Sequence, residues 1–217
     1  MNYADFTLVD LLDAFASNDP VPGGGSASAL AGALGVSLLI MVAGNPKTRT
    51  GAPEEGADLA EAAARLRPLR DTLLALVDRD SASYQAVLEA MHEPKDTDEQ
   101  KARRRDAIAA AMVGATEVPL ETMRACQQAL RGAVIVAWNG NPMAGSDTGV
   151  GIELLTAAMR GAAMNIDVNV QGLTDAAFVD RVETERRQLE ADAAEDVQLA
   201  TVSFRPPSKD SARTPPP

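Results

Sequence analysis

The chain has 217 residues, which is enough for one domain with a sizeable core. Aromatic residues make up 3% of it and its formal charge is −11, which favours a core of small aliphatic side chains and argues against binding to nucleic acid or an anionic membrane. The single cysteine, Cys126, excludes an internal disulfide, and with the single histidine, His92, it argues against a metal site. Asp5, Asp10 and Asp13 do not suit a signal peptide, so we expect a cytoplasmic protein.

The most distinctive stretch follows a short amphipathic helix expected over residues 6–17. It reads PVPGGGSASALAGALGVSLLIMVAGNP at residues 20–46 and contains no charged residue. We expect Ser26 to cap a helix there, with the backbone before it freed by three glycines, Gly23, Gly24 and Gly25. Unpaired N–H groups at such a helix start, beside the positive end of the helix dipole, form an anion site. We therefore predict a central, fully buried helix whose entrance faces a ligand.

Two other interpretations of this stretch stay open. A transmembrane helix needs about 20 mostly apolar residues, and the stretch is long enough, although serines and glycines dilute it. The three glycines could also form a plain flexible turn. Residues 45–57 follow as a loop rich in Pro and Gly, where Lys47 and Arg49 are either solvated charges or cations for a ligand.

A long helix is expected from about residue 57 to 91, with Pro68 bending it near its start. Its apolar residues recur at steps of three and four: Leu66, Leu69, Leu73, Leu76, Tyr84, Val87 and Met91. Asp80 stands in the middle of this face, where an apolar residue is expected. A carboxylate there is costly unless it is paired with a neighbouring helix or serves chemistry, and we prefer the second interpretation.

The next segments supply further helices. Residues 92–97 form a turn that includes His92 and Lys95, and Thr97 with Gln100 predicts a capping box. The basic run at residues 101–105 is typical of a solvated face, and Pro119 is expected to end this helix, with another helix continuing to about Trp138.

Residues 139–149 form a second polar loop that includes Asn141, and Ser146 with Asp147 is expected to open the next helix. That helix carries Val150, Leu154, Ala157 and Gly161 on one face. Asn165 and Asn169 follow one turn apart, where their amides could bind a flat polar heterocycle or simply join two helices.

Thr174 is expected to cap a last helix, and the Pro/Ser-rich residues 205–217 are predicted to be a disordered tail. No convincing strand is present. The sequence therefore predicts an all-α, single-domain bundle of about six helices over residues 1–204, around the central Gly/Ala-rich helix.

The motifs resemble those of the cyclodeaminase/cyclohydrolase family, which includes formiminotransferase-cyclodeaminase C-terminal domains and bacterial methenyltetrahydrofolate cyclohydrolases. The matches are PGGGS, VDRDSASY at 77–84 with Asp80 as the family's second acid, and EPKDTDEQKARR at 93–104. They continue with VPL at 118–120, GN at 140–141 and SD at 146–147, followed by Gly161, Asn165 and Asn169. The segment after Gly44 departs from better-known members.

The resemblance implies folate one-carbon chemistry without a metal or a cofactor beyond the tetrahydrofolate substrate. We expect cyclohydrolysis of 5,10-methenyltetrahydrofolate to formyltetrahydrofolate, with cyclodeamination of 5-formiminotetrahydrofolate as the alternative. Asp80 is the expected general acid/base and Asp147 the second carboxylate. Groups expected to bind the substrate are the backbone at Gly23, Gly24, Gly25 and Ser26, the cations Lys47, Arg49 and Lys95, and Asn141, Ser146, Asn165 and Asn169.

The resemblance also implies at least a homodimer with sites near the subunit contact. Two further function classes stay open at this point. One is a non-catalytic helical module for oligomerisation or folate binding, and the other is a membrane-associated helical protein.

Overall fold

The computed structural model describes residues 2–204, so the predicted tail at 205–217 lies outside the described residues. Helices account for nearly all of the described chain, and no strand is found in it beyond an isolated bridge between Thr48 and Gly140. The predicted all-α bundle is confirmed. Its α-helices are α1 (Leu8–Ala16), α2 (Gly24–Ala43), α3 (Pro53–His92), α4 (Asp98–Asn139), α5 (Gly145–Val170) and α6 (Ala176–Phe204), with short 3₁₀ helices η1 (Tyr3–Asp5) and η2 (Pro142–Ala144).

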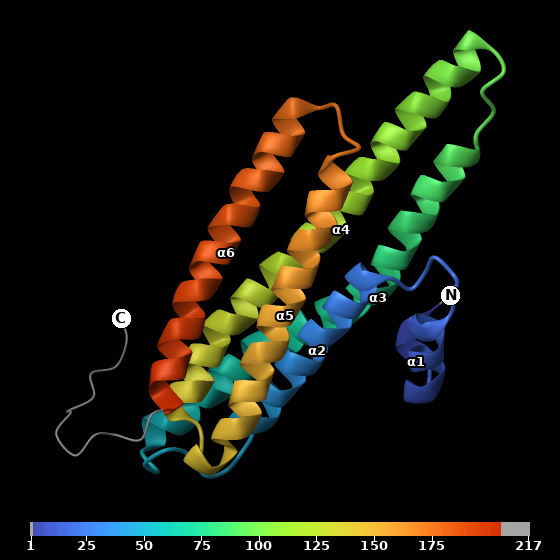
Figure 1. Ribbon diagram of the computed structural model, residues 1–217. Coiled ribbons are helices and arrows are strands. Elements are labelled where there is room, and N and C mark those ends of the chain that lie inside the picture. The colour runs from blue at the N-terminus through green and yellow to red at the C-terminus, as the bar shows by residue number, and fades with distance from the viewer. Residues whose placement is uncertain (1, 205–217) are drawn as a thin grey trace.

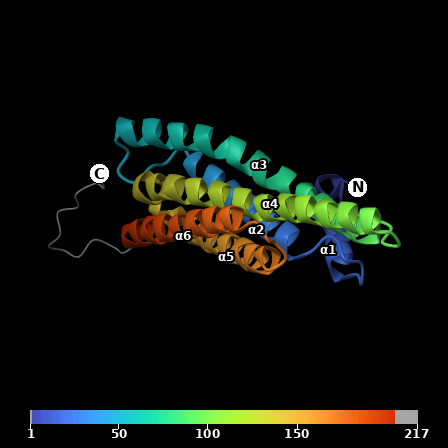
Figure 2. The ribbon, with the colours of Figure 1, turned by 90° about the horizontal axis from the view of Figure 1, so that it is seen from above.

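The long helices α2 to α6 run side by side as a bundle, whereas α1 stands away from it beside α2 (Figure 1). Seen from above, α3 lies on one side of α4 while α5 and α6 lie on the other (Figure 2). The helix α2 packs against α3, α4 and α5, and α6 packs chiefly on α4. Because α3 and α4 are twice as long as α2, both extend well beyond its first residue.

Small residues let α2 approach its neighbours closely. A Cβ atom placed on Gly32 would lie 3.0 Å from the Cys126 sulfur, and one placed on Gly35 would lie 2.7 Å from the Gly151 carbonyl oxygen. Three contacts, Gly24 with Asn165, Ser28 with Gly161 and Gly35 with Leu154, show that α2 and α5 are antiparallel in a constant register. The alanines and glycines of α2 therefore allow its backbone to pack closely against the neighbouring helices of the bundle.

Several predicted helix ends are wrong. Gly23 is the N-cap of α2, and Ser26 lies within the helix, where its side chain reaches α3 instead of capping. Ser146 lies within α5, which starts at Gly145, and the side chain of Asp175 rather than Thr174 caps α6. The capping box of Thr97 and Gln100 is confirmed.

The predicted break at Pro119 is also wrong. The helix α4 runs without interruption through Pro119, which is buried among neighbouring core residues such as Leu120. A proline removes one N–H donor from the helix interior, and here the packing of the surrounding bundle outweighs that loss. Pro68 likewise lies inside a continuous α3.

The predicted faces hold only in part. On α3, Leu66, Leu73 and Leu76 are buried as expected, but Tyr84 and Met91 are exposed. On α5, Leu154 and Gly161 of the named face contact α2, whereas Val150 and Ala157 are exposed. The core receives Ile152, Leu155, Met159 and Ile166.

The helix α2 is central but not fully buried, which corrects the prediction. Leu34 and Met41 on its outer side are each 53% exposed. Within residues 2–204, α2 is also the one helix long and apolar enough to span a membrane, and 56% of its apolar window is buried inside the bundle. Core helices of soluble proteins share these properties, so this finding is weak evidence for a membrane.

Candidate active site

Asp80 of α3 and Ser26 of α2 form the centre of a small polar cluster between these helices. The Ser26 hydroxyl lies 2.9 Å from Asp80 Oδ2, 2.8 Å from the Val77 carbonyl oxygen and 3.0 Å from the Ser81 hydroxyl. Ser26 and Ser81 are buried, while Asp80 is half-buried. The odd carboxylate on the apolar face of α3 therefore has a defined partner on the central helix.

The hydroxyl of Ser26 can serve both protonation states of Asp80, because it has one donor and two acceptor positions. When Asp80 is ionised, Ser26 donates its proton to the carboxylate. When Asp80 is protonated, Ser26 can accept from the acid and donate to the Val77 carbonyl instead. A group that gains and loses a proton in each catalytic cycle needs such an adaptable neighbour.

The absence of a side chain at Gly25 leaves room for the Asp80 carboxylate. A Cβ atom on Gly25 would lie 2.5 Å from Asp80 Cγ and 2.7 Å from Oδ2, and closer still to Oδ1. The backbone N–H of Ser26 also hydrogen bonds to Asp80. The anion at the start of α2 is thus a side chain of the protein, whereas the sequence had suggested that a ligand anion would meet these N–H groups.

Burial governs the protonation of Asp80. Loss of solvent raises the pKa of its carboxyl above the ordinary value, and the side-chain and backbone hydrogen bonds from Ser26 act in the opposite direction. The net direction is upward. A carboxyl with a raised pKa can take up a proton and release it more readily near neutral pH than an exposed aspartate.

The two predicted asparagines lie at the same end of α5 but have different surroundings. The amide nitrogen of Asn165 lies 3.7 Å from the position of a Cβ on Gly24, and it donates to the Gly161 carbonyl of its own helix. Asn169 donates to the Ala115 carbonyl of α4 at 2.8 Å. Asn165 therefore lies beside the start of α2, while the amide of Asn169 joins two helices, as the simpler interpretation predicted.

The other predicted residues lie far from Asp80 within one chain. Asp147 is in the first turn of α5 and Asn165 in its last turns, so about 27 Å of helix axis separates them at about 1.5 Å per residue. Ser146 and Asn141 lie at the same corner as Asp147, and the Asn141 side chain caps η2. Within one chain, Asp80 and Asp147 therefore lie at opposite ends of α2.

The predicted cations are also distant from Asp80. Arg49 lies in the loop after α2, where its guanidinium donates to the Ala137 carbonyl at 2.7 Å and its backbone N–H to Asn139. Lys47 is in the same loop. Lys95 is exposed in the turn between α3 and α4, beyond the end of α3 (Figure 1).

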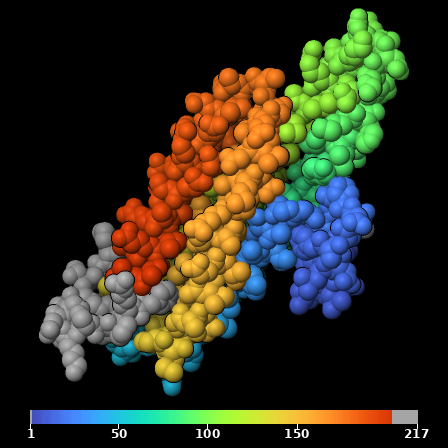
Figure 3. Space-filling model, viewed as in Figure 1, coloured from blue at the N-terminus to red at the C-terminus, as the bar shows by residue number. Residues whose placement is uncertain are grey.

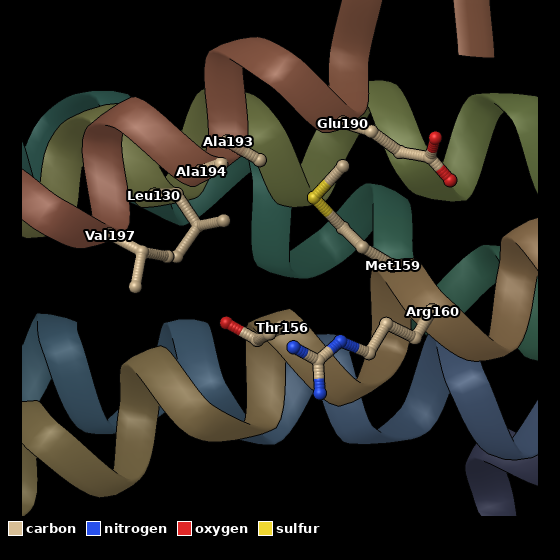
Figure 4. A pocket seen from close by; sticks show the side chains of 8 residues that line it. All are labelled: Leu130, Thr156, Met159, Arg160, Glu190, Ala193, Ala194 and Val197. Atoms are coloured by element: carbon tan, nitrogen blue, oxygen red, sulfur yellow. The ribbon is translucent and has the colours of Figure 1, made fainter. Parts of the chain in front are cut away.

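A separate cavity of about 300 Å³ lies between α4, α5 and α6 (Figure 4). Its lining is mainly apolar, with Thr156, Arg160 and Glu190 as the polar members, and it includes no predicted site residue. Among residues 2–204 there is also no group of three or more His, Cys, Asp or Glu that could hold a metal ion.

Sequence reasoning singled out Asp80 and Ser26 but missed Ser81. This serine directly follows Asp80 in the VDRDSASY segment and is buried against Ser26. Its spacing on the helix, four residues after the buried Val77, could have indicated an inward-facing hydroxyl.

Comparison with known proteins gives consistent matches. The family model described as Formiminotransferase-cyclodeaminase matches residues 7–188. The chain is 39% identical over 187 residues to a methenyltetrahydrofolate cyclohydrolase of Methylorubrum extorquens, covering 86% of this chain and 90% of that protein. It is 32% identical over 157 residues to a formimidoyltransferase-cyclodeaminase of Gallus gallus, covering 72% of this chain and 29% of that protein.

A solved structure gives the same fold. The crystal structure of formiminotetrahydrofolate cyclodeaminase from Thermotoga maritima superposes with a TM-score of 0.82 at 22% identity, over 92% of this chain and 96% of that one. At this identity the likeness shows the fold alone.

Proposed function

The chain belongs to the formiminotransferase-cyclodeaminase family, and we propose that it is a tetrahydrofolate one-carbon enzyme that hydrolyses 5,10-methenyltetrahydrofolate to formyltetrahydrofolate. The observation that carries this choice is the similarity to the Methylorubrum extorquens cyclohydrolase along 90% of that protein. In contrast, the chain spans about a third of the length of the formimidoyltransferase-cyclodeaminases that it matches.

Asp80 is the proposed general acid/base. Water adds to the methenyl carbon, which is the cationic carbon between two nitrogens, and gives up a proton to the ionised Asp80. The C–O bond forms, and Asp80 returns the proton to the leaving nitrogen. That C–N bond then breaks as the formyl C=O forms, and the remaining hydroxyl proton leaves to solvent, so that one proton is released for each cationic substrate hydrolysed. The negative charge of Asp80 also stabilises the cationic substrate, and Ser26 holds the carboxylate in position.

Cyclodeamination is the second candidate, because the matching family model and the Gallus gallus relative carry that name. In that reaction N10 of 5-formiminotetrahydrofolate attacks the formimino carbon and ammonia leaves. Asp80 would again move the proton, now toward the departing ammonia. The two reactions therefore use the same carboxylate and differ in the nucleophile and leaving group.

The third candidate, a non-catalytic module, would be favoured by two features together: an arginine paired with Asp80, and the absence of a cleft beside residues 23–26. Arg79, its neighbour in sequence, pairs with Glu121 instead, and none of the ion pairs found among residues 2–204 includes Asp80. An ionisable carboxylate that has a hydroxyl partner but no cationic partner suits proton transfer better than structural pairing.

The proposed enzyme acts as a homodimer in the cytoplasm, without a metal or a further cofactor. On the outer apolar side of α2, Leu34 and Met41 are each 53% exposed. This exposure supports the packing of a second copy of the chain against that side of the helix. An apolar surface of this kind on a monomer marks an interaction site more often than a free surface.

An absorbance assay with the purified protein tests the function. The protein receives methenyltetrahydrofolate and formiminotetrahydrofolate in separate reactions. Loss of methenyl absorbance above the spontaneous rate supports the cyclohydrolase, and its appearance from the formimino compound supports the cyclodeaminase. The Asp80→Asn variant is the background control in both reactions, and equal rates for this variant and the wild type would contradict the role of Asp80.

A further inference from the structure

We propose that the cavity between α4, α5 and α6 binds a small amphiphilic carboxylate. Its acid group pairs with Arg160, and its apolar body lies against Leu130 and Met159. The lining of this cavity includes neither Asp80 nor any residue expected to bind the folate substrate. The inference is therefore independent of the proposed function.

The cavity exists because α6 leaves one side of α5 uncovered. The helix α6 packs chiefly on α4 and touches α5 much less, although α5 and α6 lie side by side on the face shown in Figure 3. At the cavity, α6 presents two small residues, Ala193 and Ala194. A single methyl group on each is too short to fill the space toward α5, and a cavity of about 300 Å³ stays open.

The inner wall of the cavity is apolar and belongs to the core of the bundle. Leu130 of α4 is 1% exposed, Met159 of α5 is 5% exposed, and Ala193 of α6 is also buried. Because these side chains are packed against the core on their other sides, they cannot move into the cavity without leaving other contacts. An apolar wall of this kind favours a hydrocarbon group over water.

The polar groups of the cavity lie along α5. Figure 4 shows the side chain of Arg160 extending along this helix toward Thr156, while Leu130 and Val197 lie across the cavity from them. The hydroxyl of Thr156 donates to the Ile152 carbonyl oxygen at 2.9 Å. This leaves the guanidinium of Arg160 as the donor available to a ligand. One side of the cavity is thus cationic and the other apolar.

The positive charge of Arg160 is not neutralised by the protein. No ion pair or hydrogen bond of its side chain is found within residues 2–204, whereas Arg181, Arg186 and Arg187 of α6 each pair with a carboxylate. Glu190 also lines the cavity, but it pairs with Arg186 at 3.2 Å. In a chain with a formal charge of −11, a cation without a partner beside an apolar cavity is suited to an anionic ligand.

These features define the ligand by its chemistry. A guanidinium binds a carboxylate through two parallel N–H···O bonds, and water exclusion by the apolar wall strengthens them. The lining contains one other charged residue, the acid Glu190, so a singly charged carboxylate fits better than a phosphate dianion.

The size of the cavity sets the length of the apolar body. About 300 Å³ is the share of roughly ten water molecules at about 30 Å³ each, so a ligand of about ten non-hydrogen atoms fits. A medium-chain monocarboxylate such as octanoate has this size and charge. A tetrahydrofolate, with its pterin, aminobenzoyl and glutamate parts, is too large.

Calorimetric titration of the purified full-length protein with octanoate tests the site. We expect saturable binding at one site per chain. Arg160→Gln should weaken this binding at least about 10-fold, which is the usual loss for a hydrogen-bonded charge partner. Ala194→Leu should abolish it by filling the cavity, and its exposed position lets the helix keep its fold. Arg187→Gln, an exposed arginine outside the lining, is the matched control and should bind as the wild type does.

A neutral analogue separates charge pairing from simple apolar adsorption. Octanol has the same chain without the carboxylate, so it should bind the wild type much more weakly than octanoate and should not distinguish Arg160→Gln from the wild type. Equal affinity of octanoate for the wild type and Arg160→Gln, or undiminished binding by Ala194→Leu, overturns the proposal.

Methyl resonances of methionine locate the bound octanoate without any activity. With ¹³C-labelled methionine methyl groups, the signal of Met159 in the cavity wall should shift on titration, and Met159→Leu identifies that signal. Met41, which is exposed on the outer side of α2, reports adsorption elsewhere. A shift at Met41 with none at Met159 overturns the proposal. A protein that binds octanoate at Met159 but turns over neither folate supports this site while contradicting the proposed function.

Discussion

Asp80 occupies the space into which a side chain at Gly25 would extend. A Cβ atom there would lie 2.5 Å from the carboxylate carbon, which is closer than real Cβ contacts come. The glycine at this position is thus explained by the carboxylate on the neighbouring helix, since residue 25 has an ordinary helical place in the first turn of α2. The pair connects the two motifs, PGGGS and VDRDSASY, in one contact.

Gly25→Ala should displace the Asp80 carboxylate and lower the rate of hydrolysis at least about 10-fold, with a cost in stability of about 1–3 kcal/mol from overpacking. Gly56→Ala is the matched control, because Gly56 lies near the start of α3, far from Asp80, and a Cβ there meets nothing within 4 Å. Turnover and urea unfolding of both variants provide the measurement. Equal turnover in the two alanine variants would argue against a catalytic position for Asp80.

Asp80→Asn should lower turnover by about 10²-fold or more, which is the usual range for loss of a general acid/base. The helical content should stay unchanged, because asparagine has the size of aspartate and can still bond to Ser26. Circular dichroism and the absorbance assay measure the two quantities. A variant that unfolds, or one that turns over normally, would contradict this prediction.

The raised pKa of Asp80 also predicts how stability depends on pH. Its carboxyl binds a proton more readily in the folded than in the unfolded chain, so the folded state gains stability as the pH falls through the raised pKa toward the unfolded value of about 3.9. Rising pH removes this contribution. The difference in unfolding free energy between wild type and Asp80→Asn should therefore move in favour of the wild type as the solution is acidified.

Taking the difference between these two proteins also removes the effect of Asp196, a buried carboxyl whose pKa is likewise raised by burial. Asp196 is the same in both chains and lies on α6, where it bonds to Gln127. A difference that does not vary with pH would mean that Asp80 has the same pKa in the folded and unfolded chain.

Ser26→Ala should shift the activity profile toward higher pH. The hydrogen bonds from Ser26 lower the pKa of Asp80 against the effect of burial, so loss of the hydroxyl raises this pKa further. The acidic limb of the kcat/KM profile then moves upward, since Asp80 must be ionised to accept a proton from water. Ser81→Ala, which removes a hydroxyl bonded to Ser26 but not to Asp80, should shift it less.

The sequence predicted what depends on local pattern and failed where tertiary packing decides. The helices, the Thr97 capping box and the apolar part of α3 follow from periodicity and capping chemistry, and the structure confirms them. Pro119 has a strong local tendency to end a helix, but its burial in the bundle overrides that tendency. No pattern in a single chain could show that Asp147 and Asp80 lie at opposite ends of α2.

The exposed face of α5 is a second case in which the local pattern and the packing of the single chain disagree. Its pattern of Val150, Leu154, Ala157 and Gly161 is that of a buried face, yet the single chain leaves Val150 and Ala157 open. Hydrophobic periodicity reports burial without saying what covers the residues. The pattern therefore fails as a description of the bundle but suits a surface between subunits.

Leu34→Arg tests this surface directly. The arginine would place a charge on the outer apolar side of α2, which is proposed to pack against a second copy of the chain, so the dimer should dissociate. Because Leu34 is 53% exposed in the single chain, the bundle itself should keep its helical content and most of its stability. Sedimentation and circular dichroism of one preparation should then show a folded monomer. An unchanged dimer would mean that the subunits meet elsewhere.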